Sequence, residues 1–293
     1  MFEQFQATPI VEIKDDLLDS KDIQLWIKRD DIIHPEISGN KWRKLKYNLI
    51  DAQKEGYQNI LTFGGAYSNH IAATAAACKR YGFKSIGIIR GDELSESSNQ
   101  TLSKAHNNGM ELRFVTRSGY RKRIDNLWLR ELASEFQAFI IPEGGSNVSA
   151  TKGVAELVTE IEIDFDYICS AVGTGGTIAG ISNELKPYQT ALGFAALKGE
   201  DYLKKEIAFL TSSKQWKLIN NYHFGGYAKL DNQLIHFIQN FYTKHQVPLD
   251  HIYTGKMLFG LFNMIQKDQF PKGTRIIAVH TGGLQGSNFY KQA

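Results

Sequence analysis

Four glycine-rich loops constrain this chain most, because each follows a short apolar run and precedes a segment of helical periodicity. They cover residues 64–70 (GGAYSNH), 144–147 (GGSN), 173–177 (GTGGT) and 280–283 (HTGG). In open sheets of parallel strands, ligands bind at the loops that leave the carboxyl ends of the strands. One such loop is weak evidence, but four in one chain predict a ligand site on a parallel sheet.

The apolar runs predict eight strands, most of them short and bounded by turn residues, as buried parallel strands are. They cover residues 24–28, 59–63, 85–89, 112–116, 138–141, 167–172, 192–197 and 275–280. Between them, apolar residues recur at helical spacing in residues 154–161, 234–241 and 258–265. This alternation predicts an α/β fold with parallel-rich sheets flanked by helices.

The length and composition limit the organisation of the chain. At about 150 residues per domain, 293 residues predict two domains. The chain has only six prolines, no internal repeat and no low-complexity tract that could serve as a linker. We therefore expect two interleaved domains rather than two in series.

The charge balance and the cysteines exclude several classes of protein. With 34 basic and 31 acidic residues the net charge is only +3, which argues against a nucleic-acid partner. Cys78 and Cys169 each lie in an apolar segment, as in a reduced cytosolic protein, and no Cys or His spacing predicts a metal site. No secretory signal begins the chain, and the longest uncharged stretch, residues 167–183, is too polar to span a membrane. We expect a cytoplasmic protein.

The loop Gly173, Thr174, Gly175, Gly176, Thr177 predicts a phosphate site. Its glycines let backbone N–H groups approach an anion, and the next helix adds its positive end. A dinucleotide loop would need a sixth-position glycine, where this chain has Ile178, and no Gly-Lys-Ser/Thr follows as in a P-loop. The alternative is a tight turn that binds nothing.

A second motif, residues 38–45, brings two lysines to the start of a helix. Asn40 is expected to be the N-cap, with Lys41 and Lys44 one turn apart on one face. Positive charges there oppose the helix dipole, so the placement favours an anionic ligand. The alternative is a solvated basic face.

Two further segments have both functional and structural interpretations. Ser68, Asn69 and His70 could present donors to a carboxylate, or Ser68 or Asn69 could simply cap the helix that follows. The basic segment 117–130 could be a nucleic-acid patch. We instead expect Ile124, Leu127 and Trp128 to form a core face beneath solvated arginines, and we assign it no function.

Taken together and in order, the motifs resemble those of fold-type-II pyridoxal-phosphate (PLP) enzymes, which share the fold of the tryptophan synthase β subunit. The nearest likeness is the family of 1-aminocyclopropane-1-carboxylate (ACC) deaminase and D-cysteine desulfhydrase. The matching pieces are residues 28–31, 39–41, 43–45, 68–70, 173–177, 253–256 and 280–283. The chain is shorter than most members, and Trp42 is bulkier than the usual residue there.

The resemblance implies a domain organisation and an assembly. A small α/β domain of residues 46–150 would interrupt a large PLP-binding domain formed by residues 1–45 and 151–293. A homodimer is implied as well.

The resemblance also implies roles for single residues. Lys41 would form the Schiff base with PLP and move a proton, and Lys44 would contact the phosphate beside the loop 173–177. Asn69 would bond the ring hydroxyl. Ser68, Asn69 and His70 would receive the substrate carboxylate, and Ser68 would act in proton transfer. Tyr253 would stack on the ring, and Tyr227 resembles a second active-site tyrosine.

The reaction turns on the partner of the pyridine nitrogen. ACC deaminases carry Glu at the position of Thr254 and Leu at that of Thr281, whereas D-cysteine desulfhydrases carry hydroxyl residues at both. A hydroxyl can pair with a neutral nitrogen, which leaves a weaker electron sink. The two threonines therefore favour β-elimination from D-cysteine or a related small amino acid to pyruvate, ammonia and hydrogen sulfide. The alternatives are ACC deaminase, a pocket that has drifted to another substrate, and a non-catalytic phosphate- or nucleotide-binding module.

Overall fold

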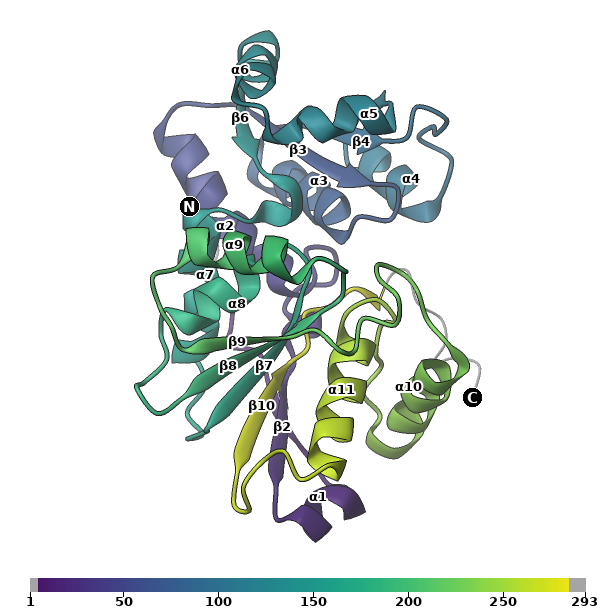
Figure 1. Cartoon of the computed structure of the whole chain (residues 1–293). Coiled ribbons are helices and arrows are strands. Elements are labelled where there is room, and N and C mark those ends of the chain that lie inside the picture. The colour runs from purple at the N-terminus through teal and green to yellow at the C-terminus, as the bar shows by residue number, and fades with distance from the viewer. Residues whose placement is uncertain (1–4, 285–293) are drawn as a thin grey trace.

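Two separate sheets organise the structure, a computed structural model that describes residues 5–284 (Figure 1). The large sheet has the order β1-β2-β10-β7-β8-β9, and every strand pair in it is parallel except β1 with β2. The small sheet has the order β5-β4-β3-β6 and is wholly parallel. The strands are β1 Ile10–Ile13, β2 Gln24–Lys28, β3 Asn59–Gly65, β4 Lys84–Arg90, β5 Met110–Val115, β6 Ala138–Ile141, β7 Tyr167–Val172, β8 Thr190–Ala195, β9 Trp216–Ile219 and β10 Arg275–Val279.

Helices cover both faces of each sheet. The α-helices are α1 Asp16–Lys21, α2 Asn40–Lys54, α3 Asn69–Tyr81, α4 Gln100–Asn107, α5 Arg117–Tyr120, α6 Asn126–Glu135, α7 Val148–Thr159, α8 Gly176–Ser182, α9 Glu200–Leu210, α10 Asn232–His245 and α11 Thr254–Gln266. The 3-10 turns are η1 Asp30–Ile32, η2 Arg121–Ile124 and η3 Glu143–Gly145.

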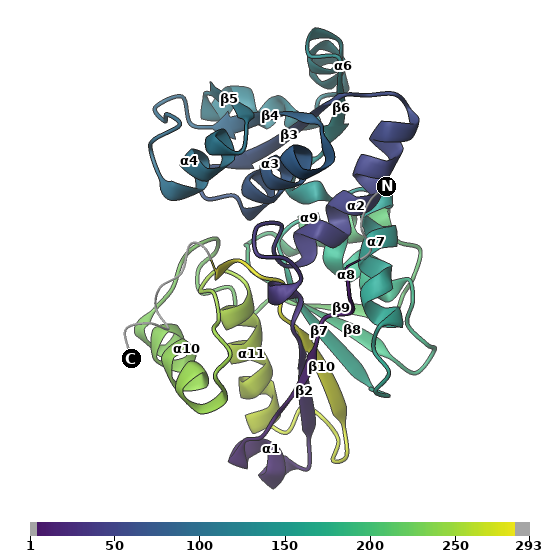
Figure 2. The same ribbon diagram turned by 180° about the vertical axis from the view of Figure 1, so that it is seen from behind.

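The hydrophobic clusters show which helices share a face. On the large sheet, α1, α10 and α11 pack on one side and α7, α8 and α9 on the other. On the small sheet, α2, α3 and α4 share one side, and α5 and α6 lie on the other. We call residues 59–141, which hold the small sheet, the small lobe, and the part built on the large sheet the large lobe. Both views place α2 where the lobes meet (Figure 2).

The predicted α/β architecture is confirmed. All eight predicted strands are present, and their ends differ from the prediction by no more than two residues. The strands of the small sheet all fall inside the interval 46–150 predicted as the small domain, although its first boundary lies within α2.

Some predictions of local structure were wrong. β1 and β9 were missed because each is a four-residue edge strand with little buried surface. Ile124 and Leu127 do not form a core face, since their exposed fractions are 76% and 67%. Asp125 starts a new helix between them by accepting N–H bonds with its side chain, which breaks the expected helical face.

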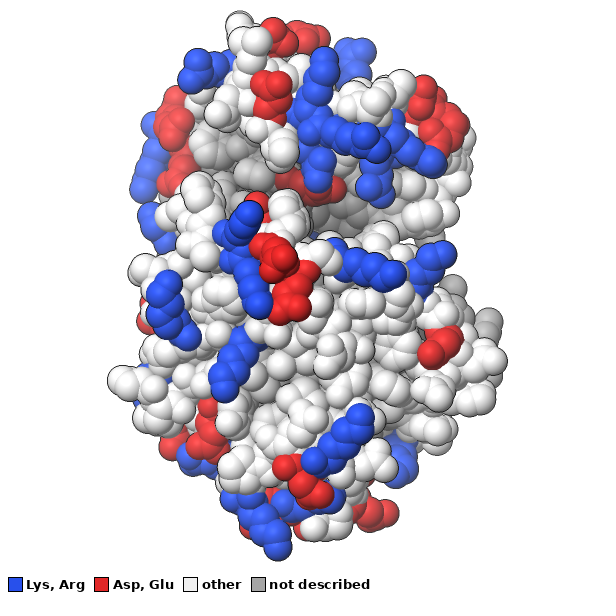
Figure 3. Space-filling view, in the orientation of Figure 1, with Lys and Arg blue, Asp and Glu red and all other residues white. Residues whose placement is uncertain are grey.

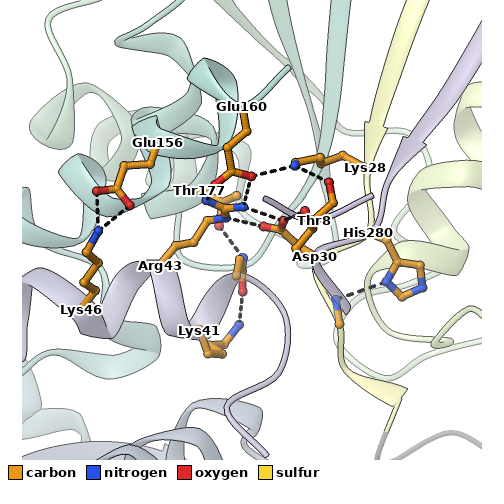
Figure 4. Close-up of polar contacts among 12 residues, drawn as sticks. Thr8, Lys28, Asp30, Lys41, Arg43, Lys46, Glu156, Glu160, Thr177 and His280 are labelled. Carbon is orange, nitrogen blue, oxygen red and sulfur yellow. Dashed lines mark hydrogen bonds and ion pairs between the residues drawn. The ribbon is translucent and has the colours of Figure 1, made fainter. Parts of the chain in front are cut away.

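A buried network of four charges fixes α2 to the large lobe (Figure 4). Arg43 donates to both oxygens of Asp30, at 2.7 and 2.9 Å, and to both oxygens of Glu160, each at 2.8 Å. Lys28 donates to Glu160 at 2.7 Å and to the Thr8 carbonyl at 2.7 Å. The two positive and two negative groups balance, so each buried charge has an opposite partner.

Replacing Arg43 by methionine should strongly destabilise the fold, because it strands the Asp30 carboxylate without a cation. We expect a loss of about 3 kcal/mol or more in the free energy of unfolding, measured by urea titration. Arg113→Met is the matched control, since Arg113 pairs with Glu111 at the surface. It should leave the urea midpoint nearly unchanged. Equal midpoints for the two variants would contradict this account of the network.

Candidate active site

A cavity of about 590 Å³ gathers most of the predicted site residues between the two lobes. All four glycine-rich loops supply residues to its wall, and the loop 144–147 does so through Gly144. The large lobe contributes the ends of β7 and β10, and the small lobe contributes the end of β3. The four loops therefore line one cavity, and the binding of a ligand there stays a prediction.

The start of α2 brings Lys41 into this cavity. Lys41 Nζ donates to Asn40 Oδ1 at 2.6 Å. Burial lowers the pKa of Lys41 from 10.5 to about 8, although the negative charge of Asp250 works in the opposite direction. Asn40 is not the N-cap as predicted, because the helix already includes it and Gly39 occupies the cap position.

Gly39 is fixed by a close approach between two backbones. Its φ is +66°, and a Cβ there would lie 2.0 Å from the Thr281 carbonyl oxygen. The same carbonyl accepts the Asn40 N–H at 3.3 Å. The helix that carries Lys41 therefore begins directly against the loop after β10.

Lys44 lies beside the loop 173–177, one turn further along α2. Its Nζ donates to the Gly144 carbonyl at 3.2 Å and to Ser146 Oγ at 3.1 Å, and it lies close to Gly176. Burial, and then the charge of Lys41, lower the pKa of Lys44 well below its usual value. A buried ammonium held only by neutral oxygens favours an anion at this end of the cavity.

Three hydroxyl groups complete this corner of the cavity. Ser146 Oγ and Thr174 Oγ1 lie 2.5 Å apart, and Thr177 Oγ1 accepts from Asn40 Nδ2 at 2.7 Å. A Cβ on Gly176 would lie 2.6 Å from Ser146 Oγ, so only glycine leaves the corner open. The corner has the kind of donors that a phosphate group requires.

The start of α3 forms the small-lobe wall of the cavity, with Ser68, Asn69 and His70. Ser68 is the N-cap, and its Oγ accepts the Ile71 N–H at 3.3 Å. Ser68 therefore caps α3, as the structural interpretation predicted. It also lines the cavity, as the functional interpretation requires. The first N–H groups of a helix have no acceptor within it, so this end of α3 attracts a carboxylate.

The imidazole of His70 is turned to the small sheet. The Thr62 hydroxyl donates to the Ile141 carbonyl at 2.8 Å, so it accepts from His70 Nε2 at 2.8 Å. Burial, and then the charges of Lys41 and Lys44, lower the pKa of His70 well below its usual value. His70 is therefore neutral, and its backbone N–H is the group that remains for a substrate carboxylate.

Two tyrosines of the large lobe meet across the cavity. The rings of Tyr227 and Tyr253 have centroids 6.3 Å apart, and their hydroxyls share a hydrogen bond. Burial raises the pKa of Tyr253 well above its usual value and raises that of Tyr227 as well. Both phenols stay protonated and can donate near neutral pH. A Cβ on Gly173 would lie 3.2 Å from the Tyr253 ring, which places this ring beside the loop 173–177.

The two threonines predicted to govern the reaction differ in their surroundings. Thr254 does not line the cavity; its hydroxyl donates to Asp250 Oδ1 at 2.6 Å. Thr281 does line it, is 8% exposed, and makes no side-chain hydrogen bond within residues 5–284. Of the pair, only Thr281 therefore offers its hydroxyl to a ligand.

Sequence reasoning missed several residues of the cavity. Asp250, Arg90, Arg123 and Glu143 all line it. Asp250 accepts the N–H groups of residues 252, 253 and 254 in addition to the Thr254 hydroxyl, so both its oxygens are occupied. The sequence signal that could have identified Asp250 is its position three residues before Tyr253.

Within the described part of the chain, no helix is long and apolar enough to cross a membrane. The same residues contain no group of three or more His, Cys, Asp or Glu side chains that could hold a metal ion. Both cysteines are buried free thiols.

Comparison with known proteins now places the chain. A family model described as pyridoxal-phosphate dependent enzyme matches residues 2–282. The chain is 33% identical to the "Putative 1-aminocyclopropane-1-carboxylate deaminase" of Pyrococcus horikoshii, over an alignment that covers 91% of this chain and 86% of that protein. It is also 33% identical to the "Bifunctional D-cysteine desulfhydrase/1-aminocyclopropane-1-carboxylate deaminase, mitochondrial" of Arabidopsis thaliana, with coverage of 90% and 73%. The crystal structure of an ACC deaminase homologue superposes with a TM-score of 0.82 at 30% identity, covering 98% of this chain and 92% of that one.

The chain belongs to the ACC deaminase/D-cysteine desulfhydrase family of fold-type-II PLP enzymes. Its cofactor is PLP. The cavity fits that cofactor: an amine of lowered pKa, Lys41, and the buried cation Lys44 lie at the start of one helix, and Gly176 leaves an open corner lined with hydroxyl groups.

Cofactor capture by the apoprotein should speed up as the pH rises through about 8, because Lys41 must lose its proton before its amine can add to an aldehyde. Stopped-flow absorbance after mixing with PLP measures the rate. Borohydride reduction and peptide mapping should then find the adduct on Lys41.

Lys256 provides the control for this experiment. Its pKa is also lowered to about 8 by burial, but it bonds to the His223 and Gly226 carbonyls and does not line the cavity. An adduct on Lys256 would show that reactivity, and not position, selects the lysine.

Proposed function

We propose that this enzyme catalyses β-elimination from D-cysteine or a related small D-amino acid, releasing pyruvate, ammonia and hydrogen sulfide. The observation that carries the proposal is the free Thr281 hydroxyl in the cavity, where an ACC deaminase would have leucine. Asp250, a carboxylate of the cavity wall, has both oxygens occupied by hydrogen bonds. Within the described residues, the cavity wall therefore has no free carboxylate that could pair with a pyridine nitrogen and keep it protonated.

Within this proposal, residues of the large lobe, the start of α2 and the start of α3 together hold the cofactor. Lys44, Ser146 and the loop Gly173, Thr174, Gly175, Gly176, Thr177 would bind the phosphate, Lys41 would bind the aldehyde carbon, and Tyr253 would cover the ring. Asn69 would bond the ring hydroxyl and Thr281 the ring nitrogen. Thr254 would act through Asp250 and not by direct contact. When bound, PLP supplies an electron sink for the bond that breaks at the substrate's α-carbon.

The side chains of the cavity would divide the remaining work. The Lys41 amine, with its pKa of about 8, can take the α-proton near neutral pH. Ser68 and the first N–H groups of α3 would orient the substrate carboxylate. The protonated Tyr227 and Tyr253 hydroxyls would give a proton to the departing sulfide.

ACC deaminase is the second candidate, because the Arabidopsis relative carries both activities in its name. A non-catalytic binding module is not supported, since the matched family consists of enzymes. A pyruvate and 2-oxobutyrate assay on D-cysteine, L-cysteine, D-serine and ACC separates the candidates. Faster release of 2-oxobutyrate from ACC than of pyruvate from D-cysteine would overturn the proposal. A homodimer and a cytoplasmic location complete the proposal, both on the family resemblance.

Thr281→Val should lower D-cysteine turnover by about a hundredfold. Valine has nearly the same shape as threonine but lacks the hydroxyl, so one well-placed donor is lost. Thr281→Ser restores the hydroxyl and should recover most of the activity. Both variants should bind PLP, and the absorbance of the bound cofactor measures this. Thr254→Glu is the less clean test, since it would place a second buried carboxylate against Asp250. Full activity in Thr281→Val would remove this hydroxyl from the reaction.

Ser68→Ala should keep PLP bound while turnover falls strongly, because a hydroxyl is lost at the substrate carboxylate. The same change also removes a helix cap, which costs about 1 kcal/mol. Asn99→Ala is the matched control: Asn99 caps α4, outside the cavity. It should lose similar stability with unchanged turnover. If Ser68→Ala behaves like Asn99→Ala in both assays, Ser68 is only a cap.

A further inference from the structure

Arg90, the last residue of β4, is exposed to solvent at the cavity wall, and none of the described carboxylates forms an ion pair with it. It lines the cavity, and its Nη2 lies close to Gly65, where a Cβ would be 3.4 Å away. Its guanidinium stands over the Tyr120 ring, with Cζ 5.8 Å from the ring centroid. Within residues 5–284, Arg90 forms no ion pair. The stacking on Tyr120 holds it in place without satisfying its charge.

The two carboxylates of the wall already have partners. Glu143 accepts from Tyr120 at 2.8 Å and from Arg123 at 2.6 Å. Asp250 is occupied at the start of α11. Both carboxylates of the cavity wall are therefore taken, and Arg90 is left for a group that the protein does not supply.

Arg90 belongs to a different element from the groups proposed to bind the α-carboxylate, and its guanidinium lies at the Gly65 end of the loop that carries them. Those groups lie at the start of α3, whereas Arg90 lies at the end of β4, and its charge acts on the Tyr227 hydroxyl from the large lobe. In Figure 3, Lys and Arg side chains gather on the small lobe beside the hollow between the lobes. Arg117, Arg121, Lys122 and Arg123 belong to α5 and η2 of the small lobe, and Arg123 lines the cavity. Such a field draws anions to the cavity.

We propose that Arg90 binds a second anionic group on the substrate, so that the related amino acids accepted beside D-cysteine include those with an acidic β-substituent, such as a phosphate ester. This inference rests on the proposed β-elimination and names its substrate class. A guanidinium pairs with such oxyanions through two parallel hydrogen bonds, which an uncharged thiol cannot match.

The reaction balances without a further reactant except water. The Cα–H bond breaks and its proton passes to the Lys41 amine, while the electron pair forms the Cα–Cβ double bond. The Cβ–X bond breaks and X leaves with its electron pair as an anion beside Arg90. One water then converts the enamine product to pyruvate and ammonium.

Binding of unreactive amino acids tests the inference on the holoenzyme. Aspartate carries a second carboxylate and alanine does not, and the change in the cofactor's absorption reports the binding of either enantiomer. We expect aspartate to bind about tenfold more tightly than alanine, since a charge-assisted pair is gained. Arg90→Gln should abolish this difference while alanine binds as before. Arg117→Gln is the control: Arg117 pairs with Glu93 outside the cavity, and the variant should keep the preference.

A turnover assay gives the second arm. The ratio of kcat/KM for O-phospho-D-serine to that for D-serine should fall about tenfold in Arg90→Gln and stay unchanged in Arg117→Gln. Equal binding of aspartate and alanine by the wild type, or a preference that survives Arg90→Gln, would overturn the assignment of Arg90. Pyruvate release from D-cysteine is measured on the same preparation. Its absence, with the aspartate preference intact, would overturn the proposed reaction and leave the Arg90 site standing.

Discussion

The buried pairing of Arg43 with Asp30 and Glu160 is the interaction on which the site depends. It joins the turn after β2, helix α2 and the end of α7, which come from distant parts of the chain. Four charges in a low-dielectric interior are stable only when all are matched, so the network tolerates little change in the position of α2. Lys41 and Lys44 flank Arg43 in sequence. Their positions in the cavity are therefore set by contacts on the opposite side of the same helix.

Electrostatics explains why the lysines occupy an unfavourable position. Both lie in the first turns of a helix, where the dipole and burial oppose a positive charge, and the pKa values of both are lowered. An anion in the corner beside Gly176 would relieve that cost, and so would loss of a proton from Lys41. The same conflict thus serves cofactor binding and the basicity that catalysis needs.

Much of the fold could be predicted from the sequence, because buried parallel strands leave a clear pattern of short apolar runs. The edge strands β1 and β9 could not, since half-exposed residues carry no such pattern. The site residues on glycine loops were predictable from motifs. Arg90 and Asp250 were not, because their importance lies in which partners surround them. Ile124 and Leu127 misled the analysis because helical spacing does not reveal that Asp125 interrupts the helix.

The contact between Gly39 and the Thr281 carbonyl limits how this enzyme can evolve. The helix start that carries Lys41, the lysine proposed to attach the cofactor, is clamped backbone to backbone against the loop after β10, with no space for any side chain at position 39. Substitution at position 39 is therefore suppressed, and so is movement of this helix start against the loop after β10. New substrate ranges have to arise on the opposite wall, where β4 and the turns after β5 present side chains to the cavity. Directed evolution of this scaffold is best confined to the small lobe.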